Sequence, residues 1–250
     1  MVDNKPTKSA DKERMAPEHL FRFQCRPGIS CFTQCCKDVT IVLTPYDVLR
    51  LKNSLKVTSD EFLDTYTIIL PKSERLIPLV VLKMNEDNKK CPFVSEKGCQ
   101  VYENRPWPCR MYPLDMGDDG SFHLIAREEN CKGLLESAEQ QISSWLEEQD
   151  IGTFDEINEL FSDVTRPLMA QKLDIDNPSI MKMIFMALYN LDKFREFVFN
   201  STFLDRFEVE PERIKRIKED ELALLKFAFD WTKFGLFGEK LFWVKENPEK

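Results

Sequence analysis

Eight cysteines carry the chemistry that this sequence could perform, and none follows residue 131 in a chain of 250 residues. They are Cys25, Cys31, Cys35, Cys36, Cys91, Cys99, Cys109 and Cys131. Thiols gathered in this way can form disulfides, bind a metal ion, hold an iron–sulfur cluster or undergo redox cycling. Their spacing matches neither the C-x2-C pair of a zinc ribbon nor the ferredoxin run, so further arguments are needed to choose among these chemistries.

A metal or redox site is favoured over structural disulfides. The N-terminus carries no apolar segment of the kind found in secretory signals, and no apolar run approaches the roughly 18 residues of a membrane-spanning helix. We therefore predict a cytoplasmic protein, and in that compartment structural disulfides are rare. A chain of 250 residues can also bury a stable core without covalent bridges.

The adjacent pair Cys35-Cys36 gives a further indication. A disulfide between neighbouring residues closes a strained ring, so each thiol is expected to face a different partner. The cysteines could supply one four-thiolate centre with spares, or two such centres. The inner set is predicted to be the six cysteines from Cys31 to Cys109, with Cys25 and Cys131 added to the candidate ligands. Zinc and an iron–sulfur cluster remain alternatives because both accept four thiolates tetrahedrally.

Other active-site chemistries find little support. The chain has two histidines, His19 and His123, so a zinc site with two usable histidines is not expected. His123 is predicted to be a structural residue of a strand spanning residues 122–126. The sequence contains neither a GxGxxG fingerprint nor a phosphate-binding P-loop. No residue is therefore assigned a catalytic role.

The distribution of charge separates the cysteine segments from the rest of the chain. The net charge is −8, which argues against general nucleic-acid binding. Residues 21–37 contain basic side chains and no acid, and cations beside thiols favour the thiolate form that binds metal. Residues 136–163 hold nine acids and no Lys or Arg. This acidic stretch could bind a basic protein partner, and no membrane or nucleic-acid partner is expected.

The elements that must position the cysteines can be read from local signals. Thr44, Pro45 and Asp47 form the start of a helix, with a capping box and proline at the first helical position. Thr58 begins a second helix, and residues 39–43 and 78–84 read as strands. Four prolines between residues 91 and 113 predict loop and short strand, a backbone that can turn N–H groups toward sulfurs.

The second half of the chain has the apolar periodicity of helices. Helices are expected over residues 134–150, from 153 toward Pro167, over 177–199, and from Pro211 onward. The predicted fold class is α+β, mainly α: an irregular cysteine-rich metal-binding domain with short strands, followed by a helical C-terminal region packed on it. The predicted division is a disordered tail over 1–18, a metal-binding domain over 19–135 and a helical domain over 136–250.

Several motifs resemble the YkgJ-type cysteine-cluster proteins. They are the Phe-x-Cys opening at Cys25, the Cys35-Cys36 pair, Leu43-Thr44-Pro45-Tyr46-Asp47-Val48, Cys91-Pro92-Phe93, and the block from Val101 through Tyr112-Pro113. The resemblance covers about residues 21–135. It implies a zinc- or iron-chelating domain with a CxxCxxCC signature, although the spacing here is C-x5-C-x3-CC. Some relatives are similar to flagellin lysine methylases.

The predicted function is therefore metal binding through the cysteine cluster, as zinc or an iron–sulfur centre, with a redox or structural role. The alternative is a metal-dependent protein-modifying enzyme of the flagellin lysine methylase type. Arg105 and Arg110 are expected to fix the Pro-rich loop around Cys109, either by donating hydrogen bonds beside the metal ligands or by pairing with Glu103 and nearby carboxylates.

Overall fold

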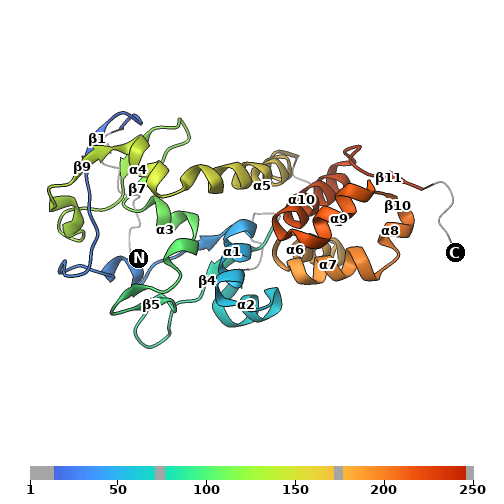
Figure 1. The fold of residues 1–250 in the computed structure, drawn as a ribbon, viewed down its shortest axis with the longest axis horizontal. Coiled ribbons are helices and arrows are strands. Elements are labelled where there is room, and N and C mark those ends of the chain that lie inside the picture. Colours follow the sequence, from blue (N-terminus) through green and yellow to red (C-terminus); the bar gives the residue numbers. More distant parts are fainter. Residues whose placement is uncertain (1–13, 71–76, 172–176, 246–250) are drawn as a thin grey trace, which may run out of the picture.

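The computed structural model describes residues 14–70, 77–171 and 177–245. The molecule is elongated: β1, β9 and α4 lie at one end, helices α6 to α10 lie at the other, and α1 and α5 run between them (Figure 1). The helices of the first two-thirds are α1 (Pro45–Leu55), α2 (Ser59–Tyr66), α3 (Trp107–Met111), α4 (Ile142–Glu148) and α5 (Ile151–Gln171). The remaining helices are α6 (Pro178–Tyr189), α7 (Leu191–Asn200), α8 (Phe203–Arg206), α9 (Pro211–Glu219) and α10 (Glu221–Phe237).

The strands are short and form small antiparallel sheets. They are β1 (Leu20–Arg22), β2 (Val42–Leu43), β3 (Thr67–Leu70), β4 (Leu79–Leu82), β5 (Val94–Ser95), β6 (Gly98–Cys99), β7 (Leu114–Met116), β8 (Phe122–Leu124), β9 (Glu139–Gln141), β10 (Phe207–Glu208) and β11 (Trp243–Val244). Strand β4 lies between β2 and β3, and the other strands pair as β1 with β9, β5 with β6, β7 with β8 and β10 with β11. The predicted fold class, α+β and mainly α, is confirmed.

The predicted helix starts around α1 and α2 are confirmed. The Thr44 hydroxyl accepts the Asp47 N–H at 3.2 Å, and the Asp47 carboxylate accepts the Thr44 N–H at 2.9 Å. Thr58 caps α2 by accepting the Glu61 N–H at 3.2 Å. Each cap satisfies an otherwise unpaired backbone donor and is worth about 1 kcal/mol. These local signals set the residue at which each helix begins, and α1 begins soon after the Cys35-Cys36 pair.

Two helix predictions in the second half are wrong in extent. The helix expected over 134–150 begins only at Ile142, because residues 139–141 form β9 and pair with β1 in the register Phe21 to Gln140. The helix expected over 177–199 breaks at Asn190, whose side chain accepts the Lys193 N–H at 3.3 Å and so starts α7. In both places a non-local pairing or a new cap satisfies backbone groups that a continuous helix would have used.

The N-terminal residues that are described do not continue the predicted tail. Residues 1–13 of that tail lie outside the described residues. Met15 is only 5% exposed, and its N–H donates to the Phe122 carbonyl at 2.8 Å. Met15 packs in a small core with Phe21, Phe122 and Trp145. Burial of these apolar side chains orders the chain ahead of β1.

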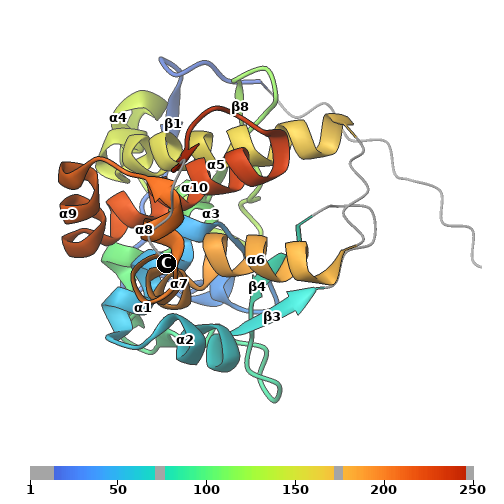
Figure 2. The same cartoon turned by 90° about the vertical axis from the view of Figure 1, so that its right-hand side faces the viewer.

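A large core joins the cysteine-bearing half to the helical half. Viewed along the long axis, α10 lies among α5, α6, α7 and α9, and it contacts all four (Figure 2). The same core includes Leu51 and Phe62 from the first half together with Phe154, Phe194 and Phe227 from the second half, and each is at most 1% exposed. The C-terminal helices therefore share a hydrophobic core with the region that carries the cysteines.

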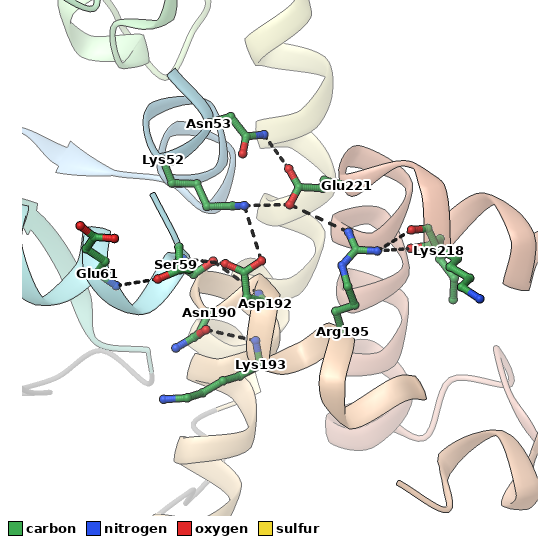
Figure 3. Close-up of polar contacts among 12 residues, drawn as sticks. Lys52, Asn53, Ser59, Glu61, Asn190, Asp192, Lys193, Arg195, Lys218 and Glu221 are labelled. Atoms are coloured by element: carbon green, nitrogen blue, oxygen red, sulfur yellow. Dashed lines mark hydrogen bonds and ion pairs between the residues drawn. The ribbon is translucent and has the colours of Figure 1, made fainter. Parts of the chain in front are cut away.

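A polar network reinforces this joint (Figure 3). The Lys52 ammonium of α1 is buried, and it lies 2.7 Å from a Glu221 carboxylate oxygen of α10 and 3.6 Å from Asp192 of α7. The Asp192 carboxylate also accepts the Ser59 N–H at 2.6 Å. Arg195 donates to the Lys218 carbonyl at 2.7 Å. Within the described part of the chain, no helix combines the length and apolarity needed to cross a membrane.

Candidate metal centre

All eight cysteines line one cavity of about 690 Å³. All eight lie in described residues and are free thiols. Cys131 is the most enclosed, at 5% exposure. Trp145 and Gln149, which come from α4 and the residue after it, also line the cavity, so the second half of the chain closes one side of it. The structure thus gathers cysteines that are more than 100 residues apart around a single space.

One group of cysteines is held where the chain before the first cysteine runs beside the segment around Cys131. The Gln24 N–H donates to the Gly133 carbonyl at 3.0 Å. A Cβ at Gly133 would lie 2.9 Å from the Gln24 carbonyl oxygen, so only glycine permits this approach. The Lys132 N–H donates to Cys31 Sγ at 3.2 Å. These contacts bring the region of Cys25 and Cys31 against Cys131.

The other group is held around the β5–β6 hairpin. The Cys91 N–H donates to the Cys36 carbonyl at 2.8 Å, which joins the adjacent cysteine pair to the start of the hairpin. Val94 of β5 pairs with Cys99 of β6. The turn requires Gly98, whose φ is +110°. Cys109 lies on the short helix α3 and lines the same cavity.

Backbone N–H groups face several sulfurs. The backbone N–H groups of Phe93 and Gly133 act to lower the pKa of the Cys91 and Cys131 thiols. The N–H groups of Val94 and Leu134 donate to the backbone carbonyls of the same two cysteines, each at 3.2 Å. The Val101 N–H acts on the pKa of the Cys99 thiol in the same direction. Such bonds lower the thiol pKa because they stabilise the thiolate, and in metal sites hydrogen bonds to the ligating sulfur tune the centre. The irregular backbone predicted around residues 91–113 therefore supplies donors to the sulfurs.

Burial and mutual proximity make most of these thiols hard to ionise. Burial raises the pKa of Cys25 to about 11, and the neighbouring sulfurs of Cys35, Cys31 and Cys131 raise it further. Burial likewise raises the pKa of Cys109 to about 12, with contributions from Cys91, Asp47 and Cys99. Crowded thiolates repel one another, and a metal cation among them removes that penalty.

The Cys35-Cys36 pair behaves differently. A hydrogen bond with Cys36 lowers the pKa of Cys35 to about 7, and the same contact raises the pKa of the Cys36 thiol. Cys36 also lies within electrostatic range of Cys109 and Cys91. Within this pair the hydrogen bond therefore favours the thiolate at Cys35 over the thiolate at Cys36.

Two arginines fix the loop that carries Cys109. The Arg110 guanidinium donates to the carbonyls of Arg105 at 3.1 Å, Gln149 at 2.7 Å and Glu103, and it stacks 4.2 Å from the centre of the Phe154 ring. The Arg105 guanidinium donates to the Tyr102 carbonyl at 2.5 Å, and its charge lowers the pKa of the Cys109 thiol. The predicted loop-fixing contacts are present, but Arg110 binds the backbone carbonyl of Glu103 instead of its carboxylate.

Sequence reasoning missed the part played by Asp47. Its carboxylate is fully enclosed, and it accepts the Trp107 N–H at 2.9 Å in addition to capping α1. Burial raises the pKa of Asp47 to about 6, while its hydrogen bonds act in the opposite direction. Asp47 therefore joins α1 to the first residue of α3. Its place in a capping box was visible in the sequence, but its bond to a residue 60 positions away was not.

All eight candidate ligands predicted from the sequence line the cavity. The structure does not distinguish the predicted inner set of six cysteines from the other two. Cys25 and Cys131 line the same space as the other six. In the described ranges, no three Cys, His, Asp or Glu side chains stand in an arrangement that could hold a single metal ion. His123 lies on β8, with Nε2 3.8 Å from Asp115 Oδ2.

Comparison with known proteins finds one match, in the part of the chain that carries the cysteines. Residues 24–133 match the family model CxxCxxCC, described as "Putative zinc- or iron-chelating domain". The matched segment contains every cysteine of the chain. Neither a curated protein nor a solved structure matches the sequence.

Proposed function

We propose that this metal-binding chain holds its metal as an iron–sulfur centre through cavity-lining thiolates, in keeping with the match of residues 24–133 to the CxxCxxCC family model. The observation that carries this proposal is the convergence of eight free thiols on one cavity of about 690 Å³. Thiolates are soft ligands, and they suit iron–sulfur clusters and zinc. We further propose that the centre has an electron-transferring or structural role and that the protein works in the reducing cytoplasm.

The cavity has room for a cluster. In a closed zinc site, four sulfurs stand about 2.3 Å from the metal and therefore about 3.8 Å from one another. Such an arrangement leaves no space beyond the ion itself. The cavity of about 690 Å³, lined by the eight cysteines and by other residues, has room for the iron and sulfide atoms of a polynuclear centre. The Lys132 N–H that donates to Cys31 Sγ, and the backbone N–H groups that act to lower the pKa of Cys91, Cys99 and Cys131, are donors of the kind that tune cluster potentials.

The surrounding residues would hold and shield such a centre. Arg110 and Asp47 fix the loop that presents Cys109, and Trp145 and Gln149 close the cavity from the second half of the chain. When bound, an iron–sulfur cluster supplies one-electron transfer and crosslinks the segments that ligate it. We propose that residues 19–135 are the metal-binding unit and that residues 136–250 support it.

The acidic stretch gives less support to a basic protein partner. Glu136 pairs with Arg26 at 2.9 Å, Glu139 pairs with Arg22 at 3.3 Å, and Glu156 pairs with Lys226 at 3.0 Å. These pairs engage three of the nine acids of the run with basic side chains of the same chain. Two of these pairs hold the β1–β9 region together beside the cavity.

Anaerobic purification followed by iron, sulfide and zinc analysis tests the proposal. We expect iron and acid-labile sulfide in equal amounts, together with a visible thiolate-to-iron absorption that disappears on reduction or chelation. Stoichiometric zinc in a colourless protein would replace the iron–sulfur centre with a zinc site. A fully folded protein without bound metal would refute metal binding. A thermal shift with S-adenosylmethionine, without any redox response, would favour the protein-modifying alternative.

A further inference from the structure

We propose that the cavity also binds an organic anion, with the carboxylate or phosphate group of that ligand paired with Arg105 and its apolar body against the aromatic side chains of the lining. This inference goes beyond the proposed function, because the site needs no metal ion. Three features of the molecule support it: a buried guanidinium without a counter-charge, two further arginines behind it, and the size and lining of the cavity.

Arg105 supplies the buried charge of the cavity wall. Among the described residues, the charged side chains that line the cavity besides the cysteines are Lys97, Arg105, Glu139 and Glu148. The other three are exposed, whereas Arg105 is only 7% exposed. Water and salt screen exposed charges far more than a buried charge. The guanidinium of Arg105 therefore dominates the electrostatic field inside the cavity.

In the part of the chain that the structure describes, no carboxylate balances this guanidinium. It donates to the Tyr102 carbonyl at 2.5 Å and to the side-chain oxygen of Gln149. These two bonds use fewer than half of the N–H groups of a guanidinium. The arginine ion pairs between described residues all involve other arginines. Because an uncompensated charge is costly to remove from water, buried charges are ordinarily paired. An anionic group in the cavity would supply the missing counter-charge.

Two more guanidiniums lie behind Arg105. Arg110 is 4% exposed and donates to the Arg105 carbonyl at 3.1 Å. Arg50 and Arg110 both donate to the Glu103 carbonyl, Arg50 at 3.4 Å. The Nε of Arg50 is buried and has no hydrogen-bond partner among the described residues. Neutral carbonyls hold these side chains in place but leave their charges uncompensated, so the wall around Arg105 is positive and favours an anion.

The lining of the cavity indicates what kind of anion fits. The Arg105 guanidinium stacks 3.8 Å from the centre of the Tyr102 ring. Stacking covers one face of the guanidinium and leaves its in-plane N–H groups for a carboxylate or phosphate. Phe32, Phe93 and Trp145 line the same space. A cavity of about 690 Å³ with apolar walls and few polar groups is typical of sites for organic ligands. The ligand expected is therefore an anion with an apolar, preferably aromatic, body.

The test titrates the full-length protein with benzoate, phenyl phosphate, neutral benzamide and inorganic phosphate, and follows binding by ligand-detected NMR and calorimetry. We expect at least one of the two aromatic anions to bind about tenfold more tightly than benzamide, which lacks the charge-assisted pair with the guanidinium. The tighter of the two identifies the head group as carboxylate or phosphate.

Variants locate the binding at Arg105. Arg105→Gln is expected to weaken the aromatic anions to the affinity of benzamide, and Arg105→Lys to restore only part of the difference, because lysine keeps the charge without the planar fork. Arg22→Gln is the matched control: it removes one positive charge from the pair with the cavity-lining Glu139, but Arg22 is 63% exposed. Its affinities are expected to stay within about twofold of wild type.

Equal affinities for the aromatic anions and benzamide would overturn the inference. Absence of binding by every probe would also overturn it and would leave cysteine thiolates as the counter-charge of Arg105. Equal weakening by Arg105→Gln and Arg22→Gln would show a general charge effect, and inorganic phosphate as tight as phenyl phosphate would refute the organic ligand. Circular dichroism monitors folding. If Arg105→Gln does not fold, Arg105→Lys and the wild-type comparison of anions with benzamide still decide.

Metal analysis of the same samples separates this inference from the proposed function. Metal-free folded protein that binds the aromatic anions would refute the proposed function and support the anion site. Metal-loaded protein that binds none of the probes would refute the anion site and leave the proposed function intact.

Discussion

Replacement of Arg110 by lysine tests how the loop around Cys109 is held. Arg110 is 4% exposed, and its guanidinium donates to three different backbone carbonyls. Lysine keeps the positive charge. Its single ammonium, however, cannot donate at once to three carbonyls that are placed around the planar guanidinium of arginine. We therefore expect Arg110→Lys to leave about two of these buried carbonyls without their charged donor.

The magnitude follows from the hydrogen bonds lost. A hydrogen bond to a charged group contributes about 1.5–3 kcal/mol, and rehydration of the carbonyls recovers part of it, so two lost bonds predict a destabilisation of about 3 kcal/mol. For a chain of this size, a change of 1 kcal/mol shifts Tm by about 2–4 °C, so the expected decrease in Tm is about 6–12 °C. Metal content is expected to fall as well, since one of the lost contacts ties the loop to Gln149 at the edge of the cavity.

Thermal denaturation of the metal-loaded full-length protein, with metal analysis of the same samples, measures both effects. Arg22→Lys is the matched control, because Arg22 is 63% exposed and makes only a surface ion pair with Glu139. Its expected effect is below about 1 kcal/mol. If Arg110→Lys melts within about 2 °C of wild type and retains its full metal content, the three carbonyl contacts do not fix the loop and the reasoning is refuted.

Three further predictions concern other parts of the structure. Burial raises the pKa of Asp47 to about 6 from 3.8, so the folded protein retains a proton that the unfolded chain releases. This group should contribute about 3 kcal/mol of stability at about pH 3 that is lost by about pH 7, and unfolding titrations of Asp47→Asn should lack this loss. Lys52→Met removes the buried partner of Glu221 and Asp192 and should cost about 2 kcal/mol in chemical denaturation, whereas the exposed Lys193→Met should cost less than about 1 kcal/mol; equal effects would contradict a special role for Lys52. Removal of metal from the full chain should expose residues 24–37 and 91–110 to protease while α6 to α10 resist cleavage, and uniform cleavage along the chain would show that the metal does not order the cysteine segments specifically.

Local signals in the sequence determined the elements whose hydrogen bonds close within a few residues. The caps at Thr44 and Thr58 were predictable because a hydroxyl and a backbone N–H three residues later satisfy each other without help from the rest of the chain. The irregular backbone around Cys91 to Pro113 was also predictable, since prolines exclude long helices there. The gathering of cysteines on segments with a basic bias indicated metal binding before any geometry was known.

Non-local contacts decided the rest. Residues 139–141 form a strand because they pair with β1, which lies more than 100 residues earlier in the chain. Such a distant partner leaves no signal in the local sequence pattern. The approach of the Lys132 N–H to Cys31 Sγ spans 101 residues, and Gly133 permits the accompanying close approach of Gln24. Sequence alone thus predicted a metal-binding domain with thiol ligands, because residue type and composition carry that chemistry. The tertiary structure decided which thiols lie together, because their neighbours depend on strand pairing and packing between distant segments.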